Sequence, residues 1–244
     1  EKIKKKIFFF DDINDDKILN IKKEINVKKT LFIIISKSGN TVETLSNTLV
    51  LNIIKKNAKN IIFISKRKNN SLYAISKKFN LYHIEHKEYI SGRYSVLSEV
   101  GIVPAFILGL NIQQLRSKTL SFLNGKSQIF LKKSAIKLTN LICSKKISNL
   151  VFLNYSPKLN KFLFWCQQLI AESLGKRNTG LMPVVSNVPK DHHSLLQLYL
   201  DGPKNKIFYI FSIEEKSKNK IGKIKLYNKD IKILTNKSLS EIKK

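Results

Sequence analysis

Short apolar runs alternate with amphipathic segments through the first part of the chain. Four of these runs each predict a buried strand, at residues 7–10, 31–35, 61–64 and 81–84. Continuous apolar runs of this length are typical of strands that are covered on both faces, as in parallel sheets.

Helices are predicted between these strands. Within residues 42–56 the apolar side chains of Val42, Leu45, Leu49 and Ile53 recur at helical spacing, and residues 71–79 predict a second helix. Strand and helix in alternation indicate a doubly wound α/β sheet.

A second set of elements begins near residue 91. Residues 95–110 predict a buried helix, and Gly175 occupies the place of a left-handed C-cap after a long helix. We expect a first domain over residues 1–90 and a second over 91–244, with the border within 85–92. The other predicted elements are helices at 134–144 and 158–174 and strands at 150–153 and 207–213, and residues from 216 onward are lysine-rich with short apolar pairs.

Composition supports a folded chain and excludes several classes. The 244 residues suffice for a substantial core, and 43% apolar residues argue against disorder. Two cysteines, Cys143 and Cys166, cannot form a disulfide scaffold or a four-cysteine zinc site. The longest apolar run, residues 101–110, is half of the roughly 20 residues that span a bilayer. We therefore expect no membrane partner.

The chain carries a formal net charge of +28, which raises the hypothesis of nucleic-acid binding. The detail argues against a specific nucleic-acid partner, because only four of the 45 cations are arginines and the lysines are scattered. Lys, Ile and Asn are all abundant, as A/T-rich codons would produce on almost any fold. A basic surface could still attract an anionic small substrate.

The N-terminus does not match a signal peptide, because Asp11 and Asp12 end the apolar run after four residues. The first residue is Glu rather than Met. We expect the sequence to start partway into a longer protein.

The most specific local motif follows the strand at 31–35 and opens the next helix. It is the run Ser36-Lys37-Ser38-Gly39-Asn40-Thr41. Ligands of open α/β sheets bind beyond the carboxyl ends of the strands, where a helix N-terminus attracts anions. Hydroxyls from Ser36, Ser38 and Thr41 and the charge of Lys37 suit a phosphate group. The alternative is an ordinary helix N-cap rich in Ser and Thr.

A second candidate lies on the helix at 158–174, which is apolar nearly all round. Gln168 and Glu172 are four residues apart and share a face. A carboxylate on so buried a helix would lose solvent, which would raise its pKa and suit it to accept a proton near neutrality. The alternative is a Glu that has reached the surface at the helix end.

Two further motifs are weaker. His192 and His193 are adjacent, so they do not converge on one metal in a helix; one could act as an acid/base group, or both could be structural. Arg93 follows Gly92 in a chain that nearly lacks arginine, which favours contact with an anion.

These four segments, in their order along the chain, resemble the phosphoglucose isomerase family. Residues 36–44 resemble its phosphate loop in the sugar-isomerase (SIS) domain, and 92–101 resemble a diagnostic signature. Residues 168–176 resemble the segment with the catalytic glutamate, and His193-Ser194 the segment with the catalytic histidine. The resemblance implies an α/β fold of two SIS-type three-layer α/β/α sandwiches with mainly parallel sheets.

The resemblance implies reversible conversion of glucose 6-phosphate to fructose 6-phosphate through a cis-enediol, in cytoplasmic glycolysis and gluconeogenesis, with no metal or organic cofactor. A homodimer would share the active site, with the histidine arriving from the partner subunit. By this resemblance Glu172 moves the proton between C2 and C1, Arg93 stabilises the enediolate and His193 assists ring opening. The implied substrate contacts are Ser36, Lys37, Ser38 and Thr41 to the phosphate, and Gln168.

The chain also departs from the family pattern. It lacks the Gly-Gly-Ser motif expected upstream of residue 7, and nothing in 221–244 matches the family's lysine in a Gln-x-Gly-Val-Glu context. We expect a piece of a full enzyme or a shortened relative. The alternative function is a non-catalytic sugar-phosphate-binding SIS fragment, which would keep the loop at 36–41 without a complete site.

Overall fold

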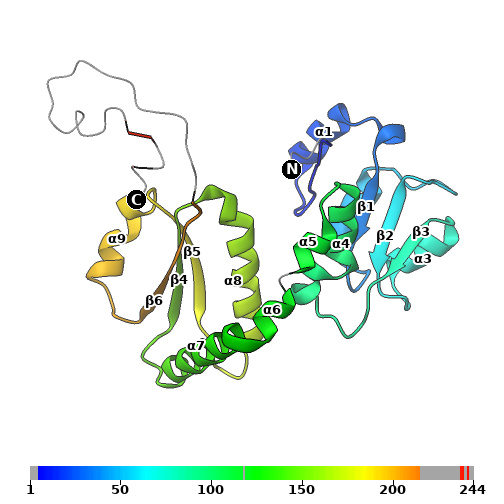
Figure 1. Cartoon of the computed structure of the whole chain (residues 1–244). Helices are drawn as coiled ribbons and strands as arrows, with labels where there is room; N and C mark the ends of the chain where they lie inside the picture. Colours follow the sequence, from blue (N-terminus) through cyan, green and yellow to red (C-terminus); the bar gives the residue numbers. More distant parts are fainter. Residues whose placement is uncertain (1–4, 118, 215–236, 239–240, 242–244) are drawn as a thin grey trace, which may run out of the picture. The chain divides into compact units, whose positions relative to one another are not determined.

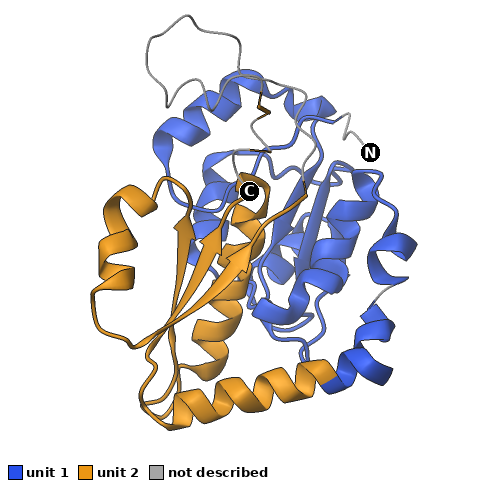
Figure 2. Cartoon of the chain, turned by 60° about the vertical axis from the view of Figure 1, so that its left-hand side comes forward, with its two compact units in different colours: residues 1–129 blue, residues 130–244 orange. Residues whose placement is uncertain are grey.

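The computed structural model describes residues 5–117, 119–214, 237–238 and 241 (Figure 1). The chain divides into two compact units, residues 1–129 and 130–244 (Figure 2). The predicted subdomain boundary between residues 90 and 91 stays a prediction, because a division into compact units does not test a boundary drawn from the sequence pattern. None of the described helices combines the length and the apolar character needed to cross a bilayer.

Unit 1 is built on a parallel sheet in the order β1-β2-β3. Its strands are β1 (Phe32–Ile35), β2 (Ile61–Ser65) and β3 (Tyr82–Glu85), which confirms the strands predicted at 31–35, 61–64 and 81–84. Phe32 is in register with Ile61, and Ile62 with Tyr82. All three strands therefore present their carboxyl ends at one edge of the sheet.

Helices α2 (Val42–Val50) and α3 (Ser71–Lys78) pack against this sheet, and α1 (Asp15–Glu24) precedes it. The core beneath α2 and α3 contains Phe32, Ile34, Ile53, Ile61, Phe63, Leu72 and Leu81. Helix α2 ends earlier than the predicted 42–56, because Asn52 takes a left-handed conformation with φ of 50°. Asn14 and Asn70 cap α1 and α3 with their side chains.

The segment after β3 differs from the single buried helix predicted at 95–110. It forms a 3₁₀ helix, η2 (Gly92–Leu97), and then α4 (Glu99–Ile107), none of whose side chains is fully buried. Ser98 separates the two by capping α4, since its hydroxyl accepts from the Val100 N–H at 3.4 Å. Short helices α5 (Ile112–Ser117) and α6 (Thr119–Leu123) follow.

Unit 2 holds a second parallel sheet in the order β5-β4-β6. The strands are β4 (Asn149–Asn154), β5 (Met182–Asn187) and β6 (Lys206–Phe211). Strands β4 and β6 confirm the runs predicted at 150–153 and 207–213. The sequence did not predict β5, because Pro183 and Ser186 interrupt its apolar pattern.

Three helices accompany this sheet: α7 (Gly125–Cys143), which crosses the boundary between the units, α8 (Asn160–Leu174) and α9 (His192–Leu200). Helices α8 and α9 lie on opposite sides of the sheet (Figure 1). Leu150, Phe152, Leu163 and Leu181 form the buried core, with residues of α7 and α8 packed against it. The α/β fold class with parallel sheets is thus confirmed.

Two local predictions are wrong. Residues 7–10 form no strand, and Phe9 is 70% exposed. Gly175 has φ of −73° and is not a left-handed cap; Arg177 and Asn178 take positive φ instead. The lysine-rich segment from residue 216 lies outside the described residues, except at 237–238 and 241.

Candidate active site

Three hydroxyl groups gather in the loop between β1 and α2. The Oγ of Ser36 lies 2.7 Å from Oγ1 of Thr41 and 3.4 Å from Oγ of Ser38, and Ser38 Oγ lies 3.5 Å from Thr41 Oγ1. Ser36 is buried and its N–H extends the sheet by donating to the Ile64 carbonyl at 3.0 Å. The loop therefore holds these hydroxyls together at the carboxyl edge of the sheet.

This arrangement differs from an ordinary helix N-cap. Thr41 is the N-cap residue of α2, yet its side chain makes no capping hydrogen bond and bonds to Ser36 instead. The first N–H groups of α2 are thus left without a side-chain cap. Because unpaired N–H groups at a helix start attract anions, the loop offers donors of both backbone and side-chain kinds. Lys37, half-buried in the same loop, adds a positive charge.

The loop is locked to its neighbour, the loop between β2 and α3. Gly39 has φ of +71°, and a Cβ there would lie 1.8 Å from Oδ1 of Asn70. The Gly39 carbonyl accepts from the Leu72 N–H at 3.1 Å, and the Lys37 carbonyl from the Lys66 N–H at 3.2 Å. Only glycine fits this close approach of the two loops, which explains why position 39 is a glycine. Asn70 was missed in the sequence analysis, since its contact joins two loops that are distant in the sequence.

Arg93 lies on η2 in unit 1 and is half-buried. Its guanidinium donates from Nη1 to Oγ of Ser91 at 3.3 Å and stacks over the ring of Tyr94 at 4.9 Å from the centroid. Stacking on an aromatic face holds the planar guanidinium in one orientation, which suits a group that recognises an anion.

A hydrogen-bonded pair of titratable side chains, His86 and Glu99, flanks the segment that carries Arg93. His86 directly follows β3 and its Nδ1 donates to Oε1 of Glu99, the first residue of α4. Sequence analysis did not single out either residue. The available signal was the presence of two titratable groups on either side of the arginine motif.

Gln168 and Glu172 share a face of α8 as predicted, and Nε2 of Gln168 donates to Oε1 of Glu172 at 2.7 Å. The expected loss of solvent is wrong for this chain, because Glu172 and Gln168 are both exposed. On α8 only Leu163 is buried, and Phe162 and Phe164 are 44% and 48% exposed. Apolar residues lie all round α8, but other parts of the described chain do not bury all of its faces.

His192 and His193 open α9 after a cis peptide bond between Val188 and Pro189. The rings of His192 and Tyr155 form a T-shaped contact with 6.0 Å between centroids, whereas His193 is exposed. Asp191 holds the turn by accepting from the Asn187 N–H at 2.7 Å. Of the two histidines, the position of His193 is the one open to a ligand.

The topology of unit 2 separates its two candidate groups. Helix α8 begins beside the carboxyl end of β4, where Nδ2 of Asn154 donates to Oδ1 of Asn160 at 2.5 Å. The helix then runs back, so Glu172 lies about 18 Å along its axis toward the amino edge of the sheet. His193 follows the carboxyl end of β5. Within one copy of unit 2, Glu172 and His193 are therefore not brought together.

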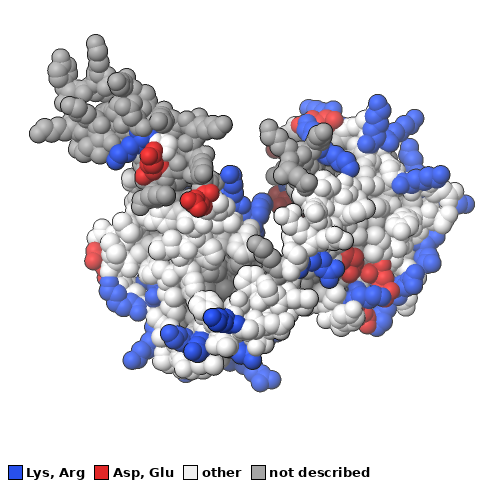
Figure 3. Space-filling view, in the orientation of Figure 1, with Lys and Arg blue, Asp and Glu red and all other residues white. Residues whose placement is uncertain are grey.

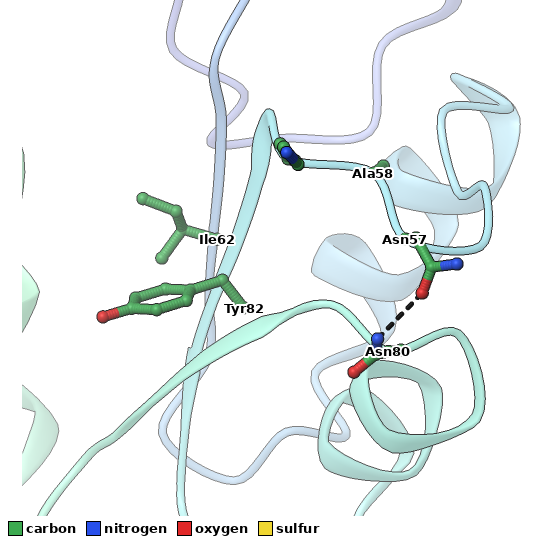
Figure 4. A pocket seen from close by; sticks show the side chains of 6 residues that line it. Asn57, Ala58, Ile62, Asn80 and Tyr82 are labelled. Carbon is green, nitrogen blue, oxygen red and sulfur yellow. Dashed lines mark hydrogen bonds between the residues drawn. The ribbon is translucent and has the colours of Figure 1, made fainter.

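A hollow of about 450 Å³ lies elsewhere, at the amino ends of β2 and β3 (Figure 4). Asn57 and Asn80 bridge its wall, where Nδ2 of Asn80 donates to Oδ1 of Asn57 at 2.8 Å. The sheet separates this hollow from the loop at 36–41, which is at the carboxyl edge, so the hollow is not part of the candidate site.

The charged side chains show no single basic stripe on the face drawn in Figure 3. Lys and Arg lie in separate groups on both units, with fewer Asp and Glu between them. Among the described residues no group of three His, Cys, Asp or Glu side chains could hold a metal ion.

Comparison with known proteins places these observations in a family. Residues 1–189 match the family model described as phosphoglucose isomerase. This span contains the hydroxyl loop, Arg93, Gln168 and Glu172, and ends before His193. A probable glucose-6-phosphate isomerase from Methanococcus maripaludis is 36% identical, covering 97% of this chain and 55% of that protein. The glucose-6-phosphate isomerase of Methanocaldococcus jannaschii is 35% identical, covering 82% of this chain and 51% of that protein.

Two solved structures are also similar. A hypothetical protein from Thermus thermophilus matches with a TM-score of 0.80 and 27% identity, over 97% of this chain and 60% of that one. A glucose-6-phosphate isomerase from Chlamydia trachomatis matches with a TM-score of 0.58 at 23% identity, over 82% of this chain and 43% of that one, and supports the fold alone. The chain spans about half the length of the curated relatives it matches.

Proposed function

Because the chain belongs to the phosphoglucose isomerase family, we propose that it contributes the substrate-binding and proton-transfer residues of a glucose-6-phosphate isomerase. The reaction is the reversible conversion of glucose 6-phosphate to fructose 6-phosphate. The hydroxyl cluster of Ser36, Ser38 and Thr41 at the uncapped start of α2 is the observation that carries the proposal. A sugar phosphate needs such an anion cradle.

In the proposed complex the phosphate ester accepts hydrogen bonds from the three hydroxyls and from the first N–H groups of α2. Lys37 adds charge attraction at the same loop. The hydroxyls bond to one another in the free loop, so they are already gathered where the ligand would sit. A site that needs little rearrangement loses little free energy to ordering on binding.

Glu172 is the proposed base. Its carboxylate takes the proton from C2 of the open-chain aldose, which leaves a cis-enediolate, and returns the proton to C1 to give the ketose. Arg93 would stabilise the negative charge that develops on the enediolate oxygens, which is the kind of preorganised interaction that contributes most to many enzymes. Gln168 donates to Glu172 and so orients its carboxylate, and would contact substrate from the same helix face.

His193 is the proposed acid/base group for opening the sugar ring. The separation of Glu172 and His193 within unit 2 supports a homodimer in which His193 is supplied by a second subunit. We propose such a dimer, with no metal or organic cofactor, acting in the cytoplasm in glycolysis and gluconeogenesis. A specific nucleic-acid or membrane partner is not part of the proposal.

An isomerase assay beside calorimetric titration with fructose 6-phosphate tests this function on the full-length gene product. We expect Glu172→Gln to lower kcat by about a thousandfold or more, because the amide cannot accept the proton. Ser38→Ala should raise KM by about tenfold or more with kcat retained, as expected for loss of one hydrogen bond to a charged group.

Two matched variants control for general effects. Glu214→Gln changes an exposed carboxylate of the same unit, and Ser46→Ala removes a hydroxyl of α2 outside the cluster; both should behave as wild type. Unchanged turnover in Glu172→Gln would remove Glu172 from the mechanism. Binding of fructose 6-phosphate without turnover in the wild type would favour the non-catalytic sugar-phosphate-binding module.

A further inference from the structure

The pair of His86 and Glu99 closes the segment that carries Arg93. His86 follows the last residue of β3, and Glu99 begins α4, so their contact joins the two ends of residues 87–98. His86 is only 1% exposed, and the side chain of Glu99 is 19% exposed. A bond across the base of a loop lowers the number of conformations that the loop can adopt.

The carboxylate of Glu99 is held by more than the imidazole. Burial alone would raise its pKa, but the hydrogen bond from His86 and the backbone N–H groups of Glu99 and Lys87 together bring the pKa below its usual value. Loss of one partner from such a pair would leave a buried polar group unpaired, which is costly. The pair therefore holds the two ends of the segment next to each other.

Hydrogen bonds at both ends of the segment link this pair to the part of the chain that bears Arg93. The His86 N–H donates to the Ser65 carbonyl at 2.8 Å, which anchors the residue to β2. At the other end the Ser98 N–H donates to the Ser95 carbonyl at 2.9 Å, and Oγ of Ser95 donates to the Gly92 carbonyl at 2.6 Å. Gly101 also packs closely on η2, since a Cβ there would lie 2.0 Å from the Val96 carbonyl oxygen.

We propose that His86 and Glu99 are positioning residues that hold Arg93 in place for catalysis by clamping the ends of the segment that bears it. The inference rests on the proposed function, because it gives Arg93 its role at the enediolate. Neither residue touches the substrate in this account. The second ring nitrogen of His86, Nε2, is buried and has no hydrogen-bond partner among the described residues, so only Nδ1 serves the clamp.

The test is a double-mutant cycle in the full-length gene product, with kcat and KM for fructose 6-phosphate as readouts. We expect Glu99→Leu, which removes the acceptor of the His86 hydrogen bond, to lower kcat about tenfold with KM changed less than about twofold. Misplacing a catalytic group affects the transition state more than substrate binding. In an Arg93→Ala background the same substitution should change kcat less than about twofold, since the group it positions is gone.

Two substitutions of His86 distinguish loss of the hydrogen bond to Glu99 from a general folding defect. His86→Asn retains an N–H donor at the place of Nδ1 and lacks Nε2, so its kcat should stay within about twofold of wild type. His86→Leu removes the donor and should behave like Glu99→Leu. Glu88→Gln is the matched control, because Glu88 lies in the same segment but forms exposed ion pairs with Lys66 and Lys68. Its kcat should not change.

An equal fall of kcat in both backgrounds would overturn the positioning role and leave an ordinary structural pair. If the wild type binds fructose 6-phosphate without turnover, the same cycle is measured on the dissociation constant of a five-carbon aldonate phosphate, whose carboxylate imitates the enediolate. Here, too, equal effects in both backgrounds overturn the inference. A wild type with neither turnover nor binding refutes the proposed function, and this inference with it.

Discussion

The loop after β1 in unit 1 and the helix α8 in unit 2 carry their candidate residues in different settings. Ser36 and Gly39 are buried, and Asn70 of a second loop presses against Gly39. On α8, by contrast, Gln168 and Glu172 are both exposed and are joined to each other by a hydrogen bond. The residues of the loop and of α8 are proposed to act in the same reaction.

The difference indicates which half of the site this chain builds alone. The anion cradle obtains its geometry from two loops of one sheet, so unit 1 alone fixes the hydroxyls. The environment of Glu172 is not determined by unit 2 alone, since the face of α8 that bears it is open in the described chain. In the proposed dimer, the pKa of that carboxylate would also depend on what covers the face.

The largest effect is expected where the two loops of unit 1 meet. Gly39→Ala would place a methyl group 1.8 Å from Oδ1 of Asn70, which is itself fixed by hydrogen bonds from its Nδ2 to the Lys66 and Lys68 carbonyls at 2.9 Å. We expect the free energy of unfolding to fall by about 2–4 kcal/mol, measured by urea denaturation.

Gly109→Ala separates the clash from the backbone strain. Gly109 has φ of +81°, but a Cβ there would meet no heavy atom within 4 Å. Its substitution should cost about 1 kcal/mol through the left-handed conformation alone. Equal losses in the two variants would show that the contact between the loops contributes nothing.

An effect of similar size is expected where α8 is attached in unit 2. Leu163 is fully buried, whereas Leu174 on the same helix is 39% exposed. Leu163→Ala should lower the free energy of unfolding by about 2–4 kcal/mol and Leu174→Ala by less than about 1 kcal/mol, again by urea denaturation. Similar losses at both positions would mean that α8 is covered on more sides than the described residues show, and the contrast with unit 1 would disappear.

The smallest effect is a pH dependence confined to unit 1. Burial lowers the pKa of His83, and the charges of Arg67 and Lys77 lower it further against an opposing effect of Glu85. The unfolded chain then binds a proton at His83 more readily than the folded chain, so stability is full above the ordinary value of 6.5 and falls as the pH drops below it.

Hydrogen exchange of the β2 and β3 amides between about pH 7.5 and 5.5 measures this loss. It should be less than about 1 kcal/mol, since solvent screens a half-exposed ring. His83→Gln should flatten the dependence in β2 and β3. If the pH dependence of hydrogen exchange persists in this variant, the titration belongs to another group.

The sequence predicted the sheets better than their surroundings. The run at 61–64 is apolar because side chains on both faces of β2 are covered: Ile61 and Phe63 on one face and Ile64 on the other are at most 1% exposed. This requirement is visible in one segment of sequence. The run at 7–10 has the same composition without the same cover, which is why it was misread. Strand β5 escaped detection because Pro183 and Ser186 interrupt its apolar run, and Pro183 is tolerated because β5 lies at an edge of the described sheet.

The candidate site was predictable where it is local. The hydroxyls at 36–41 follow one strand and open one helix, so a short motif describes them. The contact of Gly39 with Asn70 and the pair of His86 and Glu99 depend on chain segments that meet only in the fold. The exposure of Glu172 depends on which face of α8 is covered, and helical spacing alone does not give that information.

The bonds between the two loops of unit 1 limit how this binding motif can be transplanted. The Gly39 carbonyl, the Lys37 carbonyl and Oδ1 of Asn40 all accept N–H groups of residues 66–72. Moving residues 36–41 alone onto a foreign scaffold would sever every one of these bonds. A protein engineer would have to graft both loops as one cassette, on adjacent parallel strands in the same register.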